Sequence, residues 1–358
     1  MTPDPDLADW FHLTSVPGLG PRTLRRLLAE LGLPGAVLAA SRATLAAIVG
    51  DALAARILGV RPDASALLDW ASREGNAVLT LADAAYPAQL LEVADPPALL
   101  YVRGDVSLLG RRALAIVGSR NPTPQGLANA ESFARAFSQA GVTIASGLAL
   151  GIDTAAHRGA LEGPGSTIAV LGTGIDVAYP ARNTALHERI AASGALVSEL
   201  PLGTPAVASN FPRRNRLISG LAHGVLVVEA AISSGSLITA RMAAEQGRDV
   251  FAIPGSIHSP LAKGCHALIK QGAKLVENAA DVLDELAATR GNAPPVRAAP
   301  GDPAADALLA HLGHEVCDLD TLASRAGLTP AEVSSMLLKL ELDGKVASLP
   351  GGRVQRLF

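Results

Sequence analysis

The stretch Arg111–Leu161, RRALAIVGSRNPTPQGLANAESFARAFSQAGVTIASGLALGIDTAAHRGAL, decides the fold of this chain. Within it, Ala113–Val117 is an apolar run of strand length, and the turn residues Gly118–Pro122 end it sharply. Thr123 and Pro124 are typical of a helix N-cap and of the first helical position. The stretch therefore opens with a strand, a glycine turn and a helix.

The same order is repeated in the second half of the stretch. Val142–Ser146 is a second apolar run and Gly147–Gly151 is a second glycine-bearing turn. Another helix follows, for which Asp153 or Thr154 is the predicted N-cap. This repetition predicts a doubly wound α/β sheet. Both turns leave the carboxyl ends of strands and lead into helix N-termini, where backbone N–H groups and the positive helix end suit a phosphate.

Further apolar runs extend the predicted sheet. Each is bounded by glycine, proline or a charged residue, and they are Thr167–Leu171, Ala195–Ser198, Val225–Glu229 and Val250–Ile253. Between residues 67 and 105, helix and strand patterns alternate. We therefore expect one large α/β domain over residues 65–289.

Residues 1–64 are predicted to form a helical domain. The turn Pro17-Gly18-Leu19-Gly20-Pro21 precedes an amphipathic helix that carries Arg22, Arg25 and Arg26. This pattern resembles a SAM-like helix-hairpin-helix, in which glycine amides and nearby arginines hold a DNA phosphate. A helical cap whose turn simply needs glycine explains the pattern equally well.

The C-terminal part is predicted to be a separate domain. Residues 290–303 are rich in proline, glycine and alanine and read as a linker. Three short helical patterns and a hairpin pattern follow in residues 304–358, which indicates a winged helix. Its recognition helix, Pro330–Leu342, has two glutamates and one lysine, whereas major-groove readers carry arginine, lysine, asparagine or glutamine. We therefore expect this domain to contact protein rather than DNA.

Composition narrows the class of protein. Of the 358 residues, 49% are hydrophobic and 18% are charged, which is typical of a globular protein. No run approaches the ~18 uninterrupted apolar residues of a membrane helix, and the first residues lack the pattern of a signal peptide. Cys265 and Cys317 lie far apart without metal-ligand spacing, which suits a reducing compartment. We expect a cytoplasmic protein without a metal.

The segment Asn210-Phe211-Pro212-Arg213-Arg214-Asn215-Arg216 is the most distinctive. No acidic residue occurs from Leu200 to Val228, so its arginines have no acidic neighbour in sequence. Phe211 stands outside any apolar periodicity, and Pro212 marks the segment as a polar loop. Arginine suits phosphates, and an exposed aromatic ring offers a stacking surface to a base. The alternative is a ring packed in the core beside a solvated charged face, but next to the glycine turns we favour single-stranded nucleic acid.

Catalytic motifs are absent from the sequence. No dinucleotide fingerprint and no G-x-x-x-x-G-K-[ST] loop occurs, which argues against NAD and against a Walker-type ATP site. Asp153 and His157 are spaced i, i+4, and other carboxylates follow predicted strands, namely Asp176, Glu199 and Glu229. A hydrolase would use such groups as acid and base, but a cap and a hydrogen-bonded helix residue explain the first pair more simply. We expect no enzymatic activity and no cofactor.

Several motifs together resemble the DNA processing protein A family (DprA, also called Smf). They are GSR at Gly118–Arg120, SGLALGID at Ser146–Asp153, SELPLG at Ser198–Gly203, FPRRNRLISGL at Phe211–Leu221, SGSLITAR at Ser234–Arg241 and RDVFAIPG at Arg248–Gly255. The resemblance runs along nearly the whole chain. It implies an extended Rossmann-like DNA-binding domain that dimerises, with accessory N-terminal helical and C-terminal winged-helix domains.

The resemblance also implies a function. It predicts a protein that binds single-stranded DNA and delivers it to the RecA recombinase during natural transformation, with single-strand-binding protein as a further partner. From the residue patterns and the resemblance together, the candidate nucleic-acid-binding residues are Gly118, Ser119, Arg120, Ser146, Gly147, Asn210, Phe211, Arg213, Arg214, Asn215, Arg216, Gly235 and Ser236. Leu150 departs from the family pattern, because many members carry a lysine at this place.

The sequence argues against two other functions. A nucleotide-processing hydrolase of the lysine-decarboxylase-like Rossmann group would carry a P-G-G-x-G-T-x-x-E signature, and SSGSLITAR at Ser233–Arg241 lacks its glycine pair and its glutamate. A double-strand DNA regulator would act through the winged helix, whose acidic recognition helix argues against this role.

Overall fold

The computed structural model describes residues 6–292 and, in the C-terminal part, residues 308–309, 311–312, 317–329, 332–334, 336–337, 340, 346–349 and 353–356. The chain divides into two compact units, Met1–Leu286 and Ala287–Phe358. Residues 293–303 of the predicted linker and residues 1–5 of the predicted N-terminal domain lie outside the described residues.

The linker does not begin at residue 290 as predicted, because α14 (Ala279–Asn292) continues to Asn292. The nearest proline is Pro294, and the single Gly291 costs only about 1 kcal/mol within a helix. None of the residues 290–292 therefore disfavours the helical conformation enough to end the helix.

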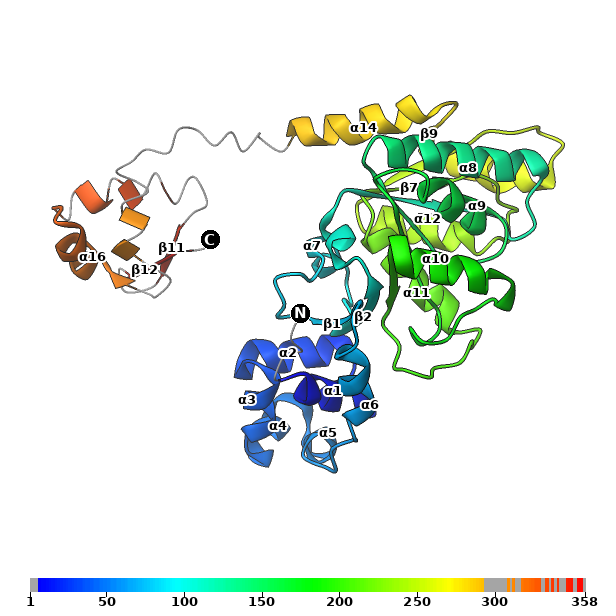
Figure 1. Cartoon of the computed structure of the whole chain (residues 1–358). Helices are drawn as coiled ribbons and strands as arrows, with labels where there is room; N and C mark the ends of the chain where they lie inside the picture. The colour runs from blue at the N-terminus through cyan, green and yellow to red at the C-terminus, as the bar shows by residue number, and fades with distance from the viewer. Residues whose placement is uncertain are drawn as a thin grey trace. The chain divides into compact units, whose positions relative to one another are not determined.

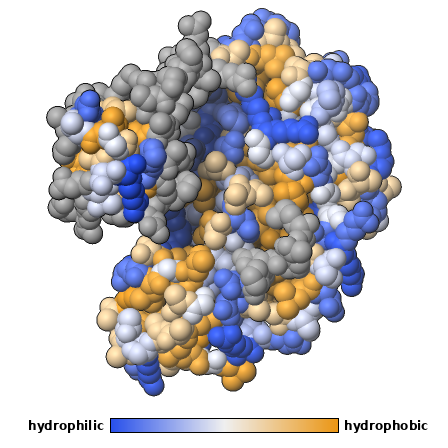
Figure 2. All heavy atoms as spheres, turned by 60° about the vertical axis from the view of Figure 1, so that its left-hand side comes forward, coloured by the Kyte–Doolittle hydropathy of each residue, from blue (hydrophilic) through white to orange (hydrophobic). Residues whose placement is uncertain are grey.

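The first unit begins with a helical bundle (Figure 1). Its helices are α1 (Leu7–Ser15), α2 (Pro21–Leu31), α3 (Pro34–Ala39), α4 (Arg42–Val49), α5 (Asp51–Ile57) and α6 (Ser65–Ala71). Trp10, Leu27 and Leu45 are fully buried in its core. This core is continuous with the large sheet, where the Trp70 and Tyr101 rings meet edge to face at 5.9 Å. Figure 2 shows hydrophobic residues over the outer surface of this bundle at the bottom of the view.

A nine-stranded sheet forms the centre of the unit, in the order β1-β2-β6-β5-β4-β3-β7-β8-β9. The strands are β1 (Asn76–Thr80), β2 (Leu99–Gly104), β3 (Ala113–Val117), β4 (Thr143–Ser146), β5 (Thr167–Val170), β6 (Ala195–Ser198), β7 (Gly224–Val227), β8 (Asp249–Ala252) and β9 (Lys274–Leu275). Strands β3 to β9 run parallel to one another, while β1 and β2 add an antiparallel edge. The predicted doubly wound α/β fold is confirmed.

Helices cover both faces of the sheet. Their bounds are α7 (Ala88–Leu91), α8 (Pro124–Gln139), α9 (Ile152–Ala160), α10 (Thr184–Ser193), α11 (Asn210–Gly220), α12 (Ser236–Glu245) and α13 (Lys263–Lys270). The strands alternate between the two layers: Leu114 and Ile116 pack with α8, α9 and α14, whereas Ala115 and Val117 pack with α11, α12 and α13. Helices α8 and α9 lie side by side (Figure 1) and so close that a Cβ on Gly159 would lie 2.1 Å from the Glu131 carbonyl oxygen.

The order of the strands creates a switch point. The chain moves from β3 through β4 and β5 to β6 in one direction, and then returns to place β7 on the other side of β3. The loops that follow β3 and β7 therefore diverge at the carboxyl edge of the sheet. In open α/β sheets this is the position where ligands bind.

The second unit has its own small core. A three-stranded sheet in the order β10-β12-β11 consists of β10 (Cys317–Asp318), β11 (Val346–Leu349) and β12 (Arg353–Arg356), and α16 (Leu319–Ala326) follows β10. The buried residues include Leu308, Leu312, Leu322, Val333, Leu340, Val346 and Val354. Helical residues packed against a small sheet are the arrangement expected of a winged helix. Lys339 and Glu341 of the predicted recognition helix lie outside the described residues.

No helix of the described chain has the length and apolar character needed to cross a membrane.

Candidate nucleic-acid interface

A cleft of about 710 Å³ opens at the switch point, between the ends of β3 and β7. Segments far apart in the sequence line it. They are the turn after β3, the start of α9, Tyr179, the first half of α11 and the segment that leads into α12, with Gly118, Ser119, Arg120, Asp153, Phe211, Arg214, Asn215, Gly235 and Ser236 among the lining residues. The topology thus brings most of the motifs that the sequence singled out into one hollow.

The first glycine turn is held against the end of β7. The Ser119 N–H donates to the Glu229 carbonyl oxygen at 2.7 Å. A Cβ on Gly118 would lie 2.6 Å from the Cγ1 atom of Ile152, so no larger residue fits at this position. Arg120, the next residue, is exposed and reaches over the cleft.

The Glu229 side chain stabilises the end of the same turn through Thr123. One of its carboxylate oxygens accepts from the Thr123 N–H at 2.9 Å and the other from the Thr123 hydroxyl at 2.6 Å. The Thr123 hydroxyl in turn accepts from the Gly126 N–H at 3.0 Å, which makes Thr123 the N-cap of α8 as predicted. Both Glu229 oxygens are therefore engaged in holding the loop.

The second glycine turn encloses a buried charge pair. Oδ2 of Asp153 accepts from the N–H groups of Gly147 at 3.1 Å and Ala149 at 3.3 Å. From the other side, Nη1 of Arg214 donates to the carbonyl oxygen of Gly147 at 2.8 Å and to that of Val170. Burial raises the pKa of Asp153, and the Arg214 charge opposes this rise. Asp153 thus braces the turn; it does not cap α9, whose N-cap is Gly151.

The prediction of a loop at 210–216 is wrong, because this segment forms the first half of α11. Proline is tolerated in the first turn of a helix, where its missing N–H has no intrahelical partner, so Pro212 does not break it. The helical repeat then sorts the segment into two faces. Phe211, Arg214 and Asn215 line the cleft. Neither Arg213 nor Arg216 does.

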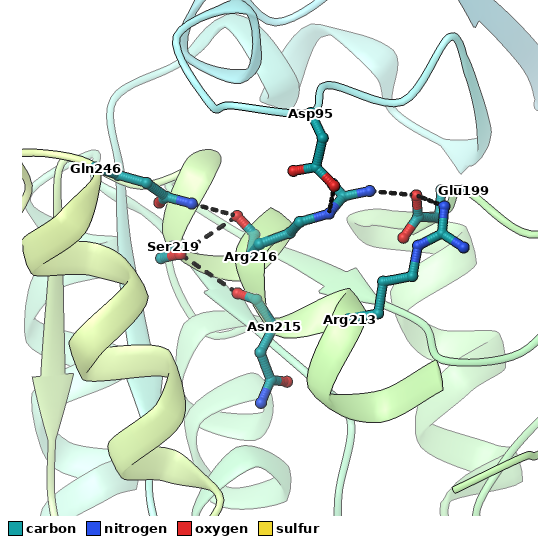
Figure 3. Close-up of polar contacts among 7 residues, drawn as sticks. All are labelled: Asp95, Glu199, Arg213, Asn215, Arg216, Ser219 and Gln246. Atoms are coloured by element: carbon teal, nitrogen blue, oxygen red, sulfur yellow. Dashed lines mark hydrogen bonds and ion pairs between the residues drawn. The ribbon is translucent and has the colours of Figure 1, made fainter. Parts of the chain in front are cut away.

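Arg213 and Arg216 instead meet acidic partners on the far side of α11 (Figure 3). Nη2 of Arg216 lies 2.5 Å from Oε2 of Glu199, and its Nε lies 3.1 Å from Oδ2 of Asp95. Arg213 reaches the same Glu199 oxygen at 3.4 Å. Burial raises the pKa of Glu199, and the charges of Arg216 and Arg213 oppose the rise. Both arginines thus share Glu199 as an acidic partner, and Asp95 is a further partner of Arg216 from a distant segment.

An aromatic pair stands in the cleft. The rings of Phe211 and Tyr179 lie 5.5 Å apart at 38° to each other. The guanidinium carbons of Arg120 and Arg214 lie 5.9 Å and 6.0 Å from the centre of the Phe211 ring. Tyr179 remains 45% exposed. Tyr179 is not among the candidate residues predicted from the sequence, although an aromatic residue in the polar, proline-marked segment DVAYPARN carries the same signal as Phe211.

The other candidate residues occupy different places. Gly235 is the N-cap of α12 and Ser236 its first residue, so the helix start faces the cleft. Gly147 lines a smaller hollow of about 80 Å³, which shares Arg120, Tyr179, Phe211 and Arg214 with the cleft. Ser146 is fully buried and donates to the Ile116 carbonyl oxygen at 2.6 Å. Asn210 begins α11 and does not line the cleft.

His157 lies behind the second turn and is fully buried. The Thr167 hydroxyl donates its proton to the Ile144 carbonyl oxygen at 2.6 Å, so it accepts from Nδ1 of His157 at 2.8 Å. Nε2 then accepts from the Leu148 N–H at 3.3 Å. Both ring nitrogens of a neutral imidazole are thus used, and burial lowers the pKa of His157 to about 3. No group of His, Cys, Asp and Glu in the described part of the chain could hold a metal ion.

Comparison with protein families gives three matches. Residues 77–287 match DNA recombination-mediator protein A, residues 292–352 match the DprA winged helix domain, and residues 12–58 match the SAM-like helix-hairpin-helix tandem. The predicted classes of the N-terminal helical and C-terminal domains are thereby confirmed.

Individual proteins of known sequence are also similar. Protein Smf of Escherichia coli K12 is 45% identical over 302 residues, which cover 80% of this chain and 79% of that protein. DNA processing protein DprA of Streptococcus pneumoniae R6 is 48% identical over 207 residues, covering 58% of this chain and 73% of that protein.

Two solved structures share the fold. The X-ray structure of DprA from S. pneumoniae matches with a TM-score of 0.69 and 39% identity, and covers 77% of this chain and 97% of its own. A structure of DNA processing protein A from Helicobacter pylori, described for its single-stranded DNA binding mode, matches with a TM-score of 0.54 and 30% identity. It covers 60% of this chain and 96% of its own.

The buried, neutral His157 makes stability depend on pH. The unfolded residue binds a proton below its ordinary pKa of 6.5, whereas the folded residue stays neutral down to about pH 3. This contribution is therefore fully present above pH 6.5 and is lost as the pH falls toward 3, by up to about 1.4 kcal/mol per pH unit. Urea unfolding at several pH values checks this, with His157→Gln as the reference because it removes the titrating group. Equal pH dependence in both proteins would contradict the assignment.

Proposed function

Because the chain belongs to the family of DNA recombination-mediator protein A, as its motifs indicated, we propose that it binds single-stranded DNA in the switch-point cleft and delivers the bound strand to the RecA recombinase during DNA uptake. The observation that carries the proposal is the convergence in one cleft of an exposed arginine, a serine-rich helix start and an accessible aromatic pair. The single-stranded DNA binding named for the H. pylori relative supports it.

The chemistry of the cleft suits an unpaired strand. The amides at the start of α12 and the Arg120 guanidinium provide the positive potential that a phosphate requires. The rings of Phe211 and Tyr179 provide a surface on which a base can stack. In a duplex the faces of the bases are stacked on their neighbours, so a single strand is the form that can use both features.

The two cleft arginines have different roles in this proposal. Arg120 is exposed and free to approach a phosphate. Arg214 is only 5% exposed, and its Nη1 is committed to two backbone carbonyl oxygens. Arg214 therefore positions the second turn and adds its charge from beneath the cleft. We assign Ser146, Arg213 and Arg216 supporting positions outside the strand-binding surface.

We propose a binding protein without catalysis. The two carboxylates nearest the turns, those of Asp153 and Glu229, accept hydrogen bonds that hold these turns. An acid or base would need a free oxygen aimed at the bound nucleotide. The alternative, a nucleotide hydrolase, would also need the glutamate of its signature, which is absent from Ser233–Arg241 of this chain.

The partners in the proposal follow from membership of the family. Transfer of the strand to RecA, assembly as a homodimer, contact with single-strand-binding protein and residence in the cytoplasm complete the proposed role. We propose that strand binding resides in the unit Met1–Leu286, while the winged helix contacts protein.

The salt dependence of binding tests the role of Arg120. Each arginine that neutralises a phosphate on a single strand contributes about 0.7 to the slope of log K against log salt. Arg120→Ala should therefore weaken binding to any sequence and flatten the slope by about that amount. Fluorescence anisotropy with a labelled oligonucleotide across a salt series measures both quantities. Arg158→Ala, an exposed arginine on α9 outside the cleft, is the matched control, and equal slopes for the two variants would contradict the assignment.

The aromatic pair is tested by removing one ring. Phe211→Ala should cost about 1–3 kcal/mol of binding free energy, as truncation of a base-stacking ring does. The salt slope should stay nearly unchanged because no charge is lost. Tyr179→Phe keeps the ring and should bind like the parent protein. If a folded Phe211→Ala variant binds with the parental affinity, Phe211 does not stack on a base.

Delivery to the recombinase is tested separately. The full chain should shorten the lag in RecA-dependent ATP hydrolysis on a single strand already covered by single-strand-binding protein. The variant Arg120→Ala/Phe211→Ala, deficient in strand binding, should lose this effect. A chain that binds the strand tightly and leaves the lag unchanged would disprove delivery without affecting the binding proposal.

A further inference from the structure

A second hollow, of about 220 Å³, lies where the helical bundle meets the sheet edge. Helices α1 and α2 form one wall, and strand β2 with the segment after β6 forms the other. Its lining includes Phe11, Leu19, Leu24, Leu99, Tyr101 and Pro201. Because Arg213 lines this hollow and Arg214 lines the cleft, the two openings lie on different sides of α11. The strand-binding site thus leaves this hollow unused.

The walls of the hollow are apolar apart from Thr14 and Ser15 at the end of α1 and one charged corner. That corner is formed by Glu199 and Arg213, which Figure 3 shows beside Arg216. The volume is below the roughly 300–1,000 Å³ of small-molecule sites. The hollow therefore suits a single large apolar side chain better than a cofactor.

Arginines on two helices lie beside the opening, namely Arg213 on α11 and Arg25 on α2. In the corner itself two arginines balance two carboxylates, since Arg213 and Arg216 face Glu199 and Asp95. The exposed Arg25 of α2 follows the lining residue Leu24. It also lies near Tyr86, whose pKa is raised by burial and lowered by the charges of Arg216 and Arg25. Arg213 keeps an exposed guanidinium that has only a 3.4 Å contact to Glu199. Since the charges of the corner balance, the surplus positive charge at the edge of the hollow is that of Arg25.

We propose that this hollow is a docking site for a partner protein that presents an acidic peptide with one large apolar anchor. The anchor enters between α1, α2 and β2, and the acidic flanks face Arg25 and Arg213. Apolar anchors in pockets with a charged rim are the usual arrangement of peptide recognition. A nucleic-acid strand fits less well, because the hollow offers little ring surface to a base: Tyr101 is 2% exposed and Phe11 is partly buried.

The test uses the full chain and fluorescein-labelled peptides in which a phenylalanine, leucine or tryptophan stands between aspartates. Anisotropy should show binding that is lost when the anchor is alanine and weakened when the aspartates are asparagines. Thr14→Trp, at an exposed lining position of α1, should fill the hollow and abolish peptide binding while single-stranded DNA binding stays unchanged. Ser15→Trp, at the neighbouring exposed lining position, repeats the block independently.

Removal of the rim charges gives a graded effect. Arg25→Ala/Arg213→Ala should weaken peptide binding by roughly tenfold, because two exposed charge pairs are lost. Absence of binding by every peptide of the set, or binding that neither tryptophan variant affects, would overturn the proposal. It would equally be overturned if a single-stranded oligonucleotide displaced the peptide and itself lost affinity in Arg25→Ala/Arg213→Ala, because the surface would then belong to the nucleic acid.

Discussion

The buried guanidinium of Arg214 is the contact on which the geometry of the cleft depends. It joins the turn after β4, the end of β5 and helix α11 through its bonds to the carbonyl oxygens of Gly147 and Val170. Burial lowers its pKa to about 10, so it stays protonated at neutral pH, and Asp153 lies close enough to oppose that shift. A buried charge is costly unless it is paired and hydrogen-bonded. The turn, the strand end and the helix must therefore keep their positions together.

The sheet and its glycine turns could be predicted because their signals are local. Short apolar runs bounded by glycine and proline specify strands, and Thr123 with Pro124 specifies the start of α8. Helix α11 could not be read in this way. Its first turn contains Pro212 and a run of polar residues, and its helical conformation is supported by burial of Leu217 and Ile218 against the sheet. A packing contact of this kind leaves no mark in the polar segment itself.

The candidate site was predictable in its location but not in the direction of each side chain. Strand ends of a parallel sheet share one edge, which places the motifs together. Whether an arginine on α11 faces the cleft depends on a helical phase that the sequence did not reveal. The partner of Arg216, Asp95, lies far away along the chain. The direction of the Ser146 side chain could not be predicted either, because a residue at the end of a strand can point into the core.

In the proposed complex, the contact between Phe211 and Tyr179 competes with a base for the facing sides of the two rings. A base that inserts between the rings would replace a contact that already shields both rings from water, so it would gain only part of the stacking free energy. Large bases displace a ring more readily than small ones, because stacking strength increases with the overlapping surface. Under the proposed function, the cleft would therefore bind purine-rich tracts more tightly than pyrimidine tracts.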